Sequence, residues 1–300
     1  MAGRVMDGRV VAKQIKLRIK EEIKRVNSSK VYPNLVTILV GDDPASKTYL
    51  RNKHSACAEV GINSRNVELK PDTSQVELER KISELNSDAS VTGILLQIPL
   101  PKGLNDASAI AAISKEKDVD GLNPCNLGLL TQRDARIAPC TPRGVILLLK
   151  YYGVKLVGQH AVVVNRTKLV GRPLMQLLLN EDATVTMCHS KTQDLAGITR
   201  QGDILITGIG RRSEFTVGSS MIKPGAAVVD IGTSSVGGKL MGDIDFEEAL
   251  KVASLVTPVP GGVGPMTISM LLYNSLLTAC MQKDVDFALN PYELASPVSA

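Results

Sequence analysis

Short apolar runs alternate with helix-like segments along nearly the whole chain, and few folds accommodate such an order. The runs are continuous rather than alternating in polarity, which indicates strands that are buried on both faces of a sheet. They lie at 35–40 (LVTILV), 91–100 (VTGILLQIPL), 160–165 (HAVVVN), 183–189 (ATVTMCH), 203–208 (DILITG) and 226–232 (AAVVDIG). We therefore predict an α/β protein with parallel sheets covered by helices.

Local signals mark where several helices begin and end. Ser74 and Glu77 have the spacing of a capping box, and Thr141 begins another helix. Gly61 and Gly153 stand where helices are expected to stop. Residues 1–26 repeat their apolar positions with a helical period and lack the apolar core of a signal peptide, so they predict an amphipathic helix.

A chain of 300 residues suits two domains. The second half repeats strand–helix units with the spacing of a nucleotide-binding fold, whereas the first half carries polar residues at strand and helix ends. We predict an N-terminal α/β catalytic domain, which binds the substrate, at 1–143 plus 268–300. A Rossmann-like nucleotide-binding domain is predicted at 144–267, with the active-site cleft between the two. The segment NPYELASPVSA at the C-terminus is expected to be loose.

Composition argues against several classes of partner. The net charge is +5, Trp is absent and there are three Phe, so the aromatic and basic pattern of a nucleic-acid-binding protein is missing. Five scattered Cys without a CxxC pair and three dispersed His predict neither a disulfide framework nor a metal site. The apolar run from Met266 to Cys280 is interrupted by polar residues and is too short to span a bilayer. We expect a protein of a reducing compartment, cytoplasmic by default.

The segment 160–179 has the order strand, tight turn and helix that opens a dinucleotide-binding fold. Asn165 occupies the turn and Gly171 the helix entry, but the full GxGxxG pattern is absent. Asparagine visits the left-handed backbone region more readily than other non-glycine residues, so it is a plausible substitute for glycine. An ordinary strand-to-helix turn explains this segment at least as well when it is taken alone.

The end of the following strand favours one cofactor over another. An NAD site usually has an acidic residue there, which binds the ribose hydroxyls. This chain instead has CHSKT at 188–192, which places Ser190 and Lys191 near the turn residue Arg166. A hydroxyl and two cations suit the 2′-phosphate of NADP, although they also suit ordinary solvated loop residues.

Polar residues in the first half form a second group of candidates. Tyr49 and Lys53 lie four residues apart on a predicted helix at 46–61 and so share one face. Gln97 interrupts an apolar strand, where an amide is costly unless it has a partner. Asp118 and Asp120 precede a glycine turn. Each has an ordinary structural explanation, and the Tyr–Lys pair cannot be that of a short-chain dehydrogenase because it precedes the nucleotide motif.

The segment TPVPGGVGPM at 257–266 combines rigid prolines with glycines that allow close approach to the backbone. It suits either a wall of main chain against a flat ligand or a tight turn between a strand at 254–259 and a helix from about Gly264. Pro99 and Pro260 are candidates for cis peptide bonds.

Taken in order, these segments resemble the bifunctional methylenetetrahydrofolate dehydrogenase/cyclohydrolase family. The motifs that carry the resemblance span almost the whole chain: YLRNK, GILLQIPLP, KDVDGLNP, PCTPRG, NRTKLVGRP, CHSKT, IKPGAAVVDIG and TPVPGGVGPMT. The resemblance implies oxidation of 5,10-methylenetetrahydrofolate with NADP and hydrolysis of the methenyl product to 10-formyltetrahydrofolate. It also implies a place in one-carbon metabolism and purine biosynthesis, and a homodimer formed through the nucleotide domain.

The resemblance assigns roles to individual residues. It implies that Lys53 is catalytic, that Tyr49 and Gln97 position it and the folate, and that Asp120 holds the pterin amino groups. Its other implied substrate-binding residues are Pro260, Gly261, Gly262 and Pro265. Its implied cofactor-binding residues are Asn165, Arg166, Thr167, Gly171, Ser190, Lys191, Thr207, Gly208, Ile231 and Thr233.

Three departures from the family pattern leave alternatives open. Asn165 and Thr167 stand where the family typically has Gly and Ser, and DIGTSS at 230–235 replaces a more usual DxGIN. The segment 208–215 adds Arg211 and Arg212, which suit either phosphate binding or solvent. An amino-acid or shikimate-type dehydrogenase and a catalytically inert NADP-binding protein remain the rival interpretations, and folate binding separates them from the family reading.

Overall fold

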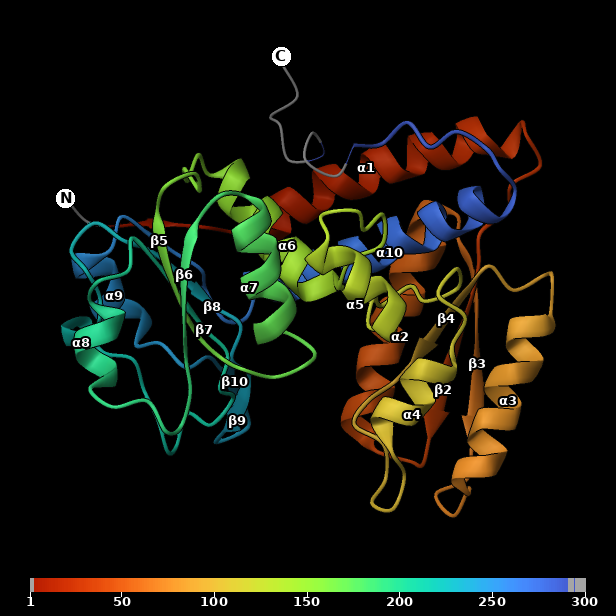
Figure 1. The fold of residues 1–300 in the computed structure, drawn as a ribbon, viewed down its shortest axis with the longest axis horizontal. Helices are drawn as coiled ribbons and strands as arrows, with labels where there is room; N and C mark the ends of the chain where they lie inside the picture. The colour runs from red at the N-terminus through yellow and green to blue at the C-terminus, as the bar shows by residue number, and fades with distance from the viewer. Residues whose placement is uncertain (1–2, 291–293, 295–300) are drawn as a thin grey trace. The chain divides into compact units, whose positions relative to one another are not determined.

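The computed structural model describes residues 3–290 and 294, which form two compact units (Figure 1). One unit holds Thr141–Ser269 with residues 3–15 and residues 290 and 294. The other holds Lys16–Cys140 and Met270–Leu289. We call them the nucleotide unit and the substrate unit. The division falls inside three continuous helices: α1 (Gly8–Asn27), α6 (Cys140–Tyr151), where it follows the first residue, and α10 (Val263–Gln282).

The nucleotide unit is built on a six-stranded sheet in the order β1-β11-β8-β7-β5-β6, and every neighbouring pair is parallel. Because β6 lies on one side of β5 and β7 on the other, the chain reverses its direction of travel across the sheet at β5. Ligands of such sheets bind at the carboxyl ends of the strands beside this reversal. The strands are β1 (Arg4–Val5), β5 (His160–Val164), β6 (Thr184–Cys188), β7 (Ile204–Thr207), β8 (Ala227–Asp230) and β11 (Leu255–Val256).

Helices cover this sheet, and a short hairpin follows β8. Figure 1 shows α7 to the right of the strands and α8 and α9 to their left. Buried Val162, Leu205 and Val228 come from three adjacent strands and form the centre of the core. The remaining elements are α6 (Cys140–Tyr151), α7 (Gly171–Asn180), α8 (Leu195–Thr199), the 3-10 helix η1 (Ser219–Met221), β9 (Ser234–Val236), β10 (Lys239–Met241) and α9 (Phe246–Val252).

The substrate unit has a three-stranded parallel sheet in the order β3-β2-β4. A single parallel bridge between Ile94 and Asp118 adds a further segment beside β4. The apolar faces of the sheet and of α3 share one core. The elements are β2 (Asn34–Val40), α2 (Pro44–Val60), β3 (Asn63–Leu69), α3 (Gln75–Ser87), β4 (Gly93–Leu96), α4 (Asp106–Ala112) and α5 (Pro124–Thr131).

The predicted fold class, α/β with a Rossmann-like domain, is confirmed, and so are several local predictions. Ser74 and Glu77 form the capping box, and Gly61 ends α2 with a left-handed φ of 95°. The peptide bonds before Pro99 and Pro260 are both cis. The predicted loose tail falls mostly outside the described residues.

The N-terminus differs from the predicted division of the chain. Residues 1–143 plus 268–300 were assigned to the catalytic domain, yet Arg4 and Val5 pair with Leu255 and Val256 of the six-stranded sheet. The first residues therefore belong to the nucleotide unit. The pairing joins segments from opposite ends of the chain, and a strand as short as β1 carries no apolar run that would reveal it.

Helix α10 is longer than the predicted apolar run. By length and composition it is the one described helix that could cross a membrane, but 78% of its most apolar stretch is buried inside the structure, as in the core helix of a soluble protein. Polar residues within it have hydrogen-bond partners: Asn274 donates to the carbonyls of Val119 and Ala138, on distant segments of the chain, at 2.9 and 3.0 Å. Among the described residues, no group of three or more His, Cys, Asp or Glu is arranged to hold a metal ion.

Candidate active site

Three predicted residues meet at the carboxyl edge of the substrate unit's sheet. Lys53 comes from α2, Gln97 directly follows β4, and Asp120 follows the segment bridged to β4. The Lys53 ammonium donates a hydrogen bond of 3.0 Å to Oε1 of Gln97. Nε2 of Gln97 donates to the carbonyl of Ile98 at 2.9 Å, which fixes the amide with its oxygen toward the lysine. The predicted strand at 91–100 thus ends at Leu96, and the amide that interrupts the apolar run has the partners that its position requires.

Asp120 lies within electrostatic reach of this pair. Burial raises the pKa of Asp120, while the positive charge of Lys53 and a hydrogen bond from Cys140 oppose the rise. A carboxyl group whose proton affinity is raised beside a lysine can hold a proton or accept N–H donors from a ligand. The site thus combines an ammonium donor, held by an amide, with a carboxyl group that can accept.

The neighbouring residues of the KDVD motif serve the fold. The Lys117 ammonium is buried and donates to the carbonyls of Leu85, Asn86 and Asp88 at 3.1, 2.7 and 2.8 Å, which caps the end of α3. Asp118 accepts hydrogen bonds from the backbone N–H groups of two following residues and from a side-chain amide, all at 2.8–2.9 Å. Both side chains hold the turn that presents Asp120.

Tyr49 lies one turn before Lys53 on α2, and 49% of it is exposed. Its ring is available to a flat ligand, as stacking requires. No interaction between Tyr49 and Lys53 is recorded among the described residues. Its role in positioning Lys53 stays a prediction.

The turn between β5 and α7 is organised by one side chain. Oδ1 of Asn165 accepts hydrogen bonds from the backbone N–H groups of Thr167 and Gly171 at 2.8 and 3.1 Å, and from the Thr167 hydroxyl at 2.8 Å. Nδ2 of Asn165 donates to the carbonyl of Gly208 in the loop after β7. Asn165 therefore joins the two loops on either side of the point where the sheet reverses.

The expected backbone conformation of Asn165 was wrong. The described non-glycine residues with positive φ are Lys30, Arg133, Asp182, Asp194 and Asp284, and Asn165 is not among them. Asn165 substitutes for a glycine through the hydrogen bonds of its amide. Gly171 is needed for space, because a Cβ at this position would lie 2.2 Å from the Asn165 carbonyl oxygen.

The same turn has the features of a phosphate site. Within the described chain, the backbone N–H groups of Arg166, Lys168 and Leu169 donate to no protein group. They precede the N-terminus of α7, a helix of 10 residues, whose dipole favours negative charge. These residues fit the pyrophosphate of a dinucleotide.

The predicted 2′-phosphate residues lie at one edge. Val164 and Cys188 are paired at the carboxyl ends of β5 and β6. Arg166 lies two residues after Val164 and Ser190 two residues after Cys188, so both follow the same edge of the sheet. Arg166, Ser190 and Lys191 are all exposed, which leaves them accessible to a ligand.

The remaining predicted cofactor residues follow β7 and β8. Gly208 and Ile231 are half-buried and Thr233 is exposed. Thr207 is fully buried, and its hydroxyl has no hydrogen-bond partner among the described residues. The Thr207 side chain is therefore buried inside the unit, whereas the next residue, Gly208, is partly exposed at the edge of the sheet.

Two buried carboxylates that the sequence analysis did not identify hold the loops at this edge. Asp230 accepts from the N–H groups of Gly232 and Ile244 at 2.9 and 2.8 Å. Asp243 accepts from the N–H groups of Ile209 and Gly210 at 2.5 and 2.9 Å. Glycines make room for both: a Cβ on Gly232 would lie 2.3 Å from the Asp243 carboxyl carbon. A strand ending in Asp-x-Gly was visible in the sequence, but the partner carboxylate was not.

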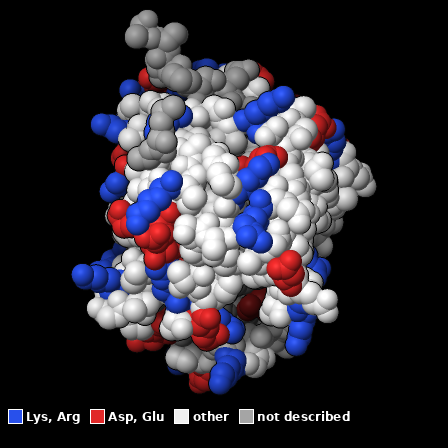
Figure 2. Space-filling model, turned by 90° about the vertical axis from the view of Figure 1, so that its left-hand side faces the viewer, with Lys and Arg blue, Asp and Glu red and all other residues white. Residues whose placement is uncertain are grey.

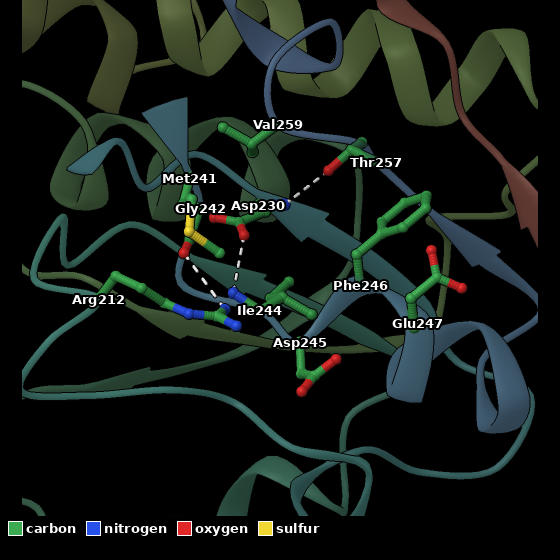
Figure 3. A pocket seen from close by; sticks show the side chains of 10 residues that line it. All are labelled: Arg212, Asp230, Met241, Gly242, Ile244, Asp245, Phe246, Glu247, Thr257 and Val259. Carbon is green, nitrogen blue, oxygen red and sulfur yellow. Dashed lines mark hydrogen bonds between the residues drawn. The ribbon is translucent and has the colours of Figure 1, made fainter. Parts of the chain in front are cut away.

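A cavity of about 210 Å³ has Asp230 in its wall (Figure 3). Arg212 reaches across it and donates to the carbonyl of Gly242 at 3.3 Å, while its backbone N–H donates to the Ser234 hydroxyl at 3.0 Å. Arg212 and Ser234 belong to the segments 208–215 and 230–235, which both depart from the family pattern. These two segments therefore contact each other. The cavity is lined by Arg212, Asp230, Met241, Gly242, Ile244, Asp245, Phe246, Glu247, Thr257 and Val259.

The proton affinity of Asp230 predicts a pH dependence of stability. Burial raises the pKa of Asp230 from 3.8 to about 6, because the charged form loses hydration. The folded state therefore binds the proton more tightly than the unfolded state. The stabilising contribution of this group is complete below pH 3.8 and is lost as the pH rises through 6, a change of about 3 kcal/mol in all.

Asp230→Asn tests this sign. We expect the unfolding free energy of the wild type, measured relative to the variant by urea denaturation, to fall by about 2–3 kcal/mol between pH 4 and pH 7. Asp203→Asn is the comparison, because the hydrogen bond from Lys223 lowers the pKa of Asp203. The contribution of Asp203 to the unfolding free energy must therefore grow as the pH rises. A flat profile for Asp230→Asn relative to the wild type would contradict the assignment.

The Pro/Gly segment at 257–266 packs against the start of α1. The N–H of Gly8 donates to the Gly261 carbonyl at 2.9 Å, and a Cβ on Gly8 would lie 1.8 Å from the Gly262 carbonyl oxygen. Pro260 is exposed, Gly261 and Pro265 are half-buried, and Gly262 is buried. The glycines thus have a packing role inside the nucleotide unit, and the predicted substrate contacts remain predictions.

The doubly wound sheet with its open phosphate turn, together with a unit that groups a lysine, an amide and a carboxyl group, places the chain among nucleotide-dependent α/β enzymes. Comparison with known proteins narrows the class. Residues 6–120 match the catalytic domain, and residues 139–283 the NAD(P)-binding domain, of the tetrahydrofolate dehydrogenase/cyclohydrolase models. The chain belongs to the tetrahydrofolate dehydrogenase/cyclohydrolase family.

Individual relatives cover nearly the full chain. The bifunctional protein FolD of Cenarchaeum symbiosum is 48% identical over 94% of this chain and 100% of its own length. The solved structure of the bifunctional FolD enzyme from Campylobacter jejuni has a TM-score of 0.89 at 44% identity, and the alignment covers 93% of this chain and 99% of that one. FolD from Trypanosoma brucei, solved with NADP and an inhibitor, has a TM-score of 0.88 at 40% identity, covering 94% and 98% of the two chains.

Proposed function

We propose that this protein oxidises 5,10-methylenetetrahydrofolate with NADP⁺ and hydrolyses the resulting 5,10-methenyltetrahydrofolate to 10-formyltetrahydrofolate. The contact that carries the second activity is the hydrogen bond between Lys53 and Gln97 at the edge that also holds Asp120. Family membership supports both activities, and the Trypanosoma brucei relative binds NADP.

The residues of the substrate unit suit proton transfer and orientation. Asp120 can accept two N–H bonds from the aminopyrimidine edge of a pterin, a charge-assisted pairing that fixes the ring. Tyr49 offers a face for stacking. Gln97 holds the Lys53 amine without adding charge, so the lysine can exchange a proton with the water that attacks the methenyl carbon.

The residues of the nucleotide unit bind and orient the cofactor. Asn165 holds the turn whose N–H groups would bind the pyrophosphate, and Arg166 with Ser190 would supply partners for the 2′-phosphate. NADP⁺ supplies the hydride acceptor when it is bound. The dehydrogenase step then needs mainly a fixed geometry, because the cofactor carries the chemistry.

The direct experiment mixes purified protein with methylenetetrahydrofolate and either NADP⁺ or NAD⁺. Reduced cofactor and the methenyl chromophore are followed together. Reduction with NADP⁺ and little accumulation of the methenyl compound supports both activities. Accumulating methenyl compound would remove the hydrolytic step from the proposal, and no reduction with either cofactor would favour the rival dehydrogenase or inert-binder interpretations.

Arg166→Gln is expected to change the KM for NADP⁺ but not the KM for NAD⁺. A guanidinium that binds the 2′-phosphate is worth about 1.5–3 kcal/mol, so the KM for NADP⁺ should rise roughly tenfold or more. The KM for NAD⁺, which lacks this phosphate, should change little. Arg200→Gln removes an exposed cation elsewhere in the nucleotide unit and should leave both constants unchanged. Equal losses with both cofactors would contradict the 2′-phosphate role.

We further propose a cytoplasmic homodimer that acts in purine biosynthesis, without nucleic-acid or membrane partners. The five cysteines are all free, which suits a reducing compartment. The face drawn in Figure 2 carries positive and negative side chains interspersed, unlike the basic stripe of a nucleic-acid-binding surface. Among the residues that the structure describes, strand β6 ends the sheet with one unpaired edge, which offers a site for pairing between copies. Light scattering on the purified protein measures the oligomeric state.

A further inference from the structure

A second cavity, of about 280 Å³, lies at the amino edge of the six-stranded sheet. Gln159 precedes β5, Asp203 precedes β7 and Ser254 precedes β11, and all three line it. Because the strands are all parallel, this edge is opposite the one that carries Asn165 and Gly208. The cavity is therefore separate from the proposed cofactor site.

Positive charge exceeds negative charge among the lining residues. Lys223 forms an ion pair of 2.6 Å with Asp203, whose other carboxylate oxygen accepts the His160 N–H at 3.0 Å. Arg4 and Lys155 also line the cavity, and neither forms an ion pair or a side-chain hydrogen bond with any described residue. The single acid is thus already neutralised, and two cations are left without a counterion.

The other polar walls of the cavity indicate which donors are available. The Tyr152 hydroxyl accepts from the Asp7 N–H at 2.8 Å and donates to the Asp7 carbonyl at 3.2 Å, so its one donor is already used. Burial raises the pKa of Tyr152, and the charge of Arg4 is among the influences that oppose the rise, which places the guanidinium within electrostatic reach of this wall. The Gln159 side-chain amide donates to no described residue. Free donors are therefore a guanidinium, an ammonium and an amide.

We propose that this amino-edge cavity binds a small molecule that carries two oxyanion groups. Arginine pairs with one carboxylate or phosphate group through two parallel hydrogen bonds, and lysine binds a second group as a point charge. The cavity is close in size to the lower limit of small-molecule sites, roughly 300 Å³, which suits a compact dianion rather than a nucleotide. Inorganic pyrophosphate and a short dicarboxylate such as glutarate share this chemistry.

Amide chemical shifts of the ¹⁵N-labelled protein test the proposal and locate the ligand. Pyrophosphate and glutarate are titrated in separate experiments at constant ionic strength. The N–H groups of Gln159 and Gly225 report on the amino-edge cavity, and those of Gly171 and Gly208 report on the opposite edge. We expect saturable shifts at Gln159 and Gly225 with at least one of the two compounds, and the compound that binds more tightly identifies the source of the oxyanions.

A double variant, Arg4→Gln with Lys155→Gln, should weaken this binding at least tenfold. Arg200→Gln with Lys239→Gln removes the same charge from exposed positions outside the cavity and should leave the binding unchanged. Shifts confined to Gly171 and Gly208, equal losses in the two double variants, or no saturable shift with either compound would each overturn the proposal. None of these outcomes depends on the folate activities.

Discussion

Lys53→Met is expected to abolish the hydrolysis of methenyltetrahydrofolate by the protein. General acid–base catalysis contributes roughly 10²- to 10⁴-fold to a rate, and methionine occupies similar space without a transferable proton. The loss in kcat/KM corresponds to about 3–5 kcal/mol of transition-state stabilisation. Decay of the methenyl absorbance, corrected for the uncatalysed reaction, measures it. The KM for NADP⁺ should stay within roughly twofold of wild type, because Lys53 belongs to the substrate unit.

Lys47→Met is the matched control for this variant. Lys47 lies on the same helix and forms an exposed ion pair with Asp42, so its removal should not change either activity. Hydrolysis that persists at the wild-type rate in Lys53→Met would remove Lys53 from the mechanism. The hydrogen bond to Gln97 would then be a structural contact only.

Lys117→Met should produce the largest loss of stability among the substitutions considered. The buried ammonium donates to three carbonyls where α3 ends. Methionine removes this donor from the carbonyls of Leu85 and Asn86, whereas the Asp88 carbonyl keeps the Val91 N–H at 3.1 Å. Hydrogen bonds from a charged donor contribute about 1.5–3 kcal/mol each and are not additive within one group, so we expect a loss of about 3–5 kcal/mol. Burial lowers the pKa of Lys117, with the charge of Asp88 opposing, which agrees with a desolvated amine. Urea denaturation measures the change.

The control is Lys115→Met, two residues earlier in the chain. Lys115 is 52% exposed and lies 3.8 Å from Glu116, a distance at which a surface ion pair contributes about 0–1 kcal/mol. The unfolding free energy of the Lys115→Met variant should therefore match that of the wild type. A loss below about 1 kcal/mol for Lys117→Met would show that water replaces the ammonium at this helix end.

The parts of the fold that could be predicted were the elements whose own residues carry a recognisable pattern. Buried strands such as 160–165 and 226–232 are continuous apolar runs, and they form β5 and β8. Strand β3, by contrast, has the sequence NSRNVEL, because an edge strand is partly exposed and needs no apolar run. The hairpin β9–β10 was missed for the same reason, since its residues are mostly exposed.

The candidate site was predictable to a different extent in each unit. Gln97 stood out because an amide inside an apolar run requires a partner, and the structure supplies Lys53. The resemblance to a family singled out Asp120, but separating its role from those of Lys117 and Asp118 required knowledge of which carbonyls and N–H groups lie nearby. Asp243 could not be identified, because its partners on the loop after β7 are far away in sequence.

Pairing between β1 and β11 also constrains how the chain folds during synthesis. Arg4 leaves the ribosome long before its partner Leu255, because the elements from α1 to α9 lie between them in the chain. Contacts of such sequence separation form slowly, because a long loop must close before they contribute any stability. Strand β1 must therefore wait without its partner while the intervening elements are made, and it can join the six-stranded sheet only after β11 has been synthesised.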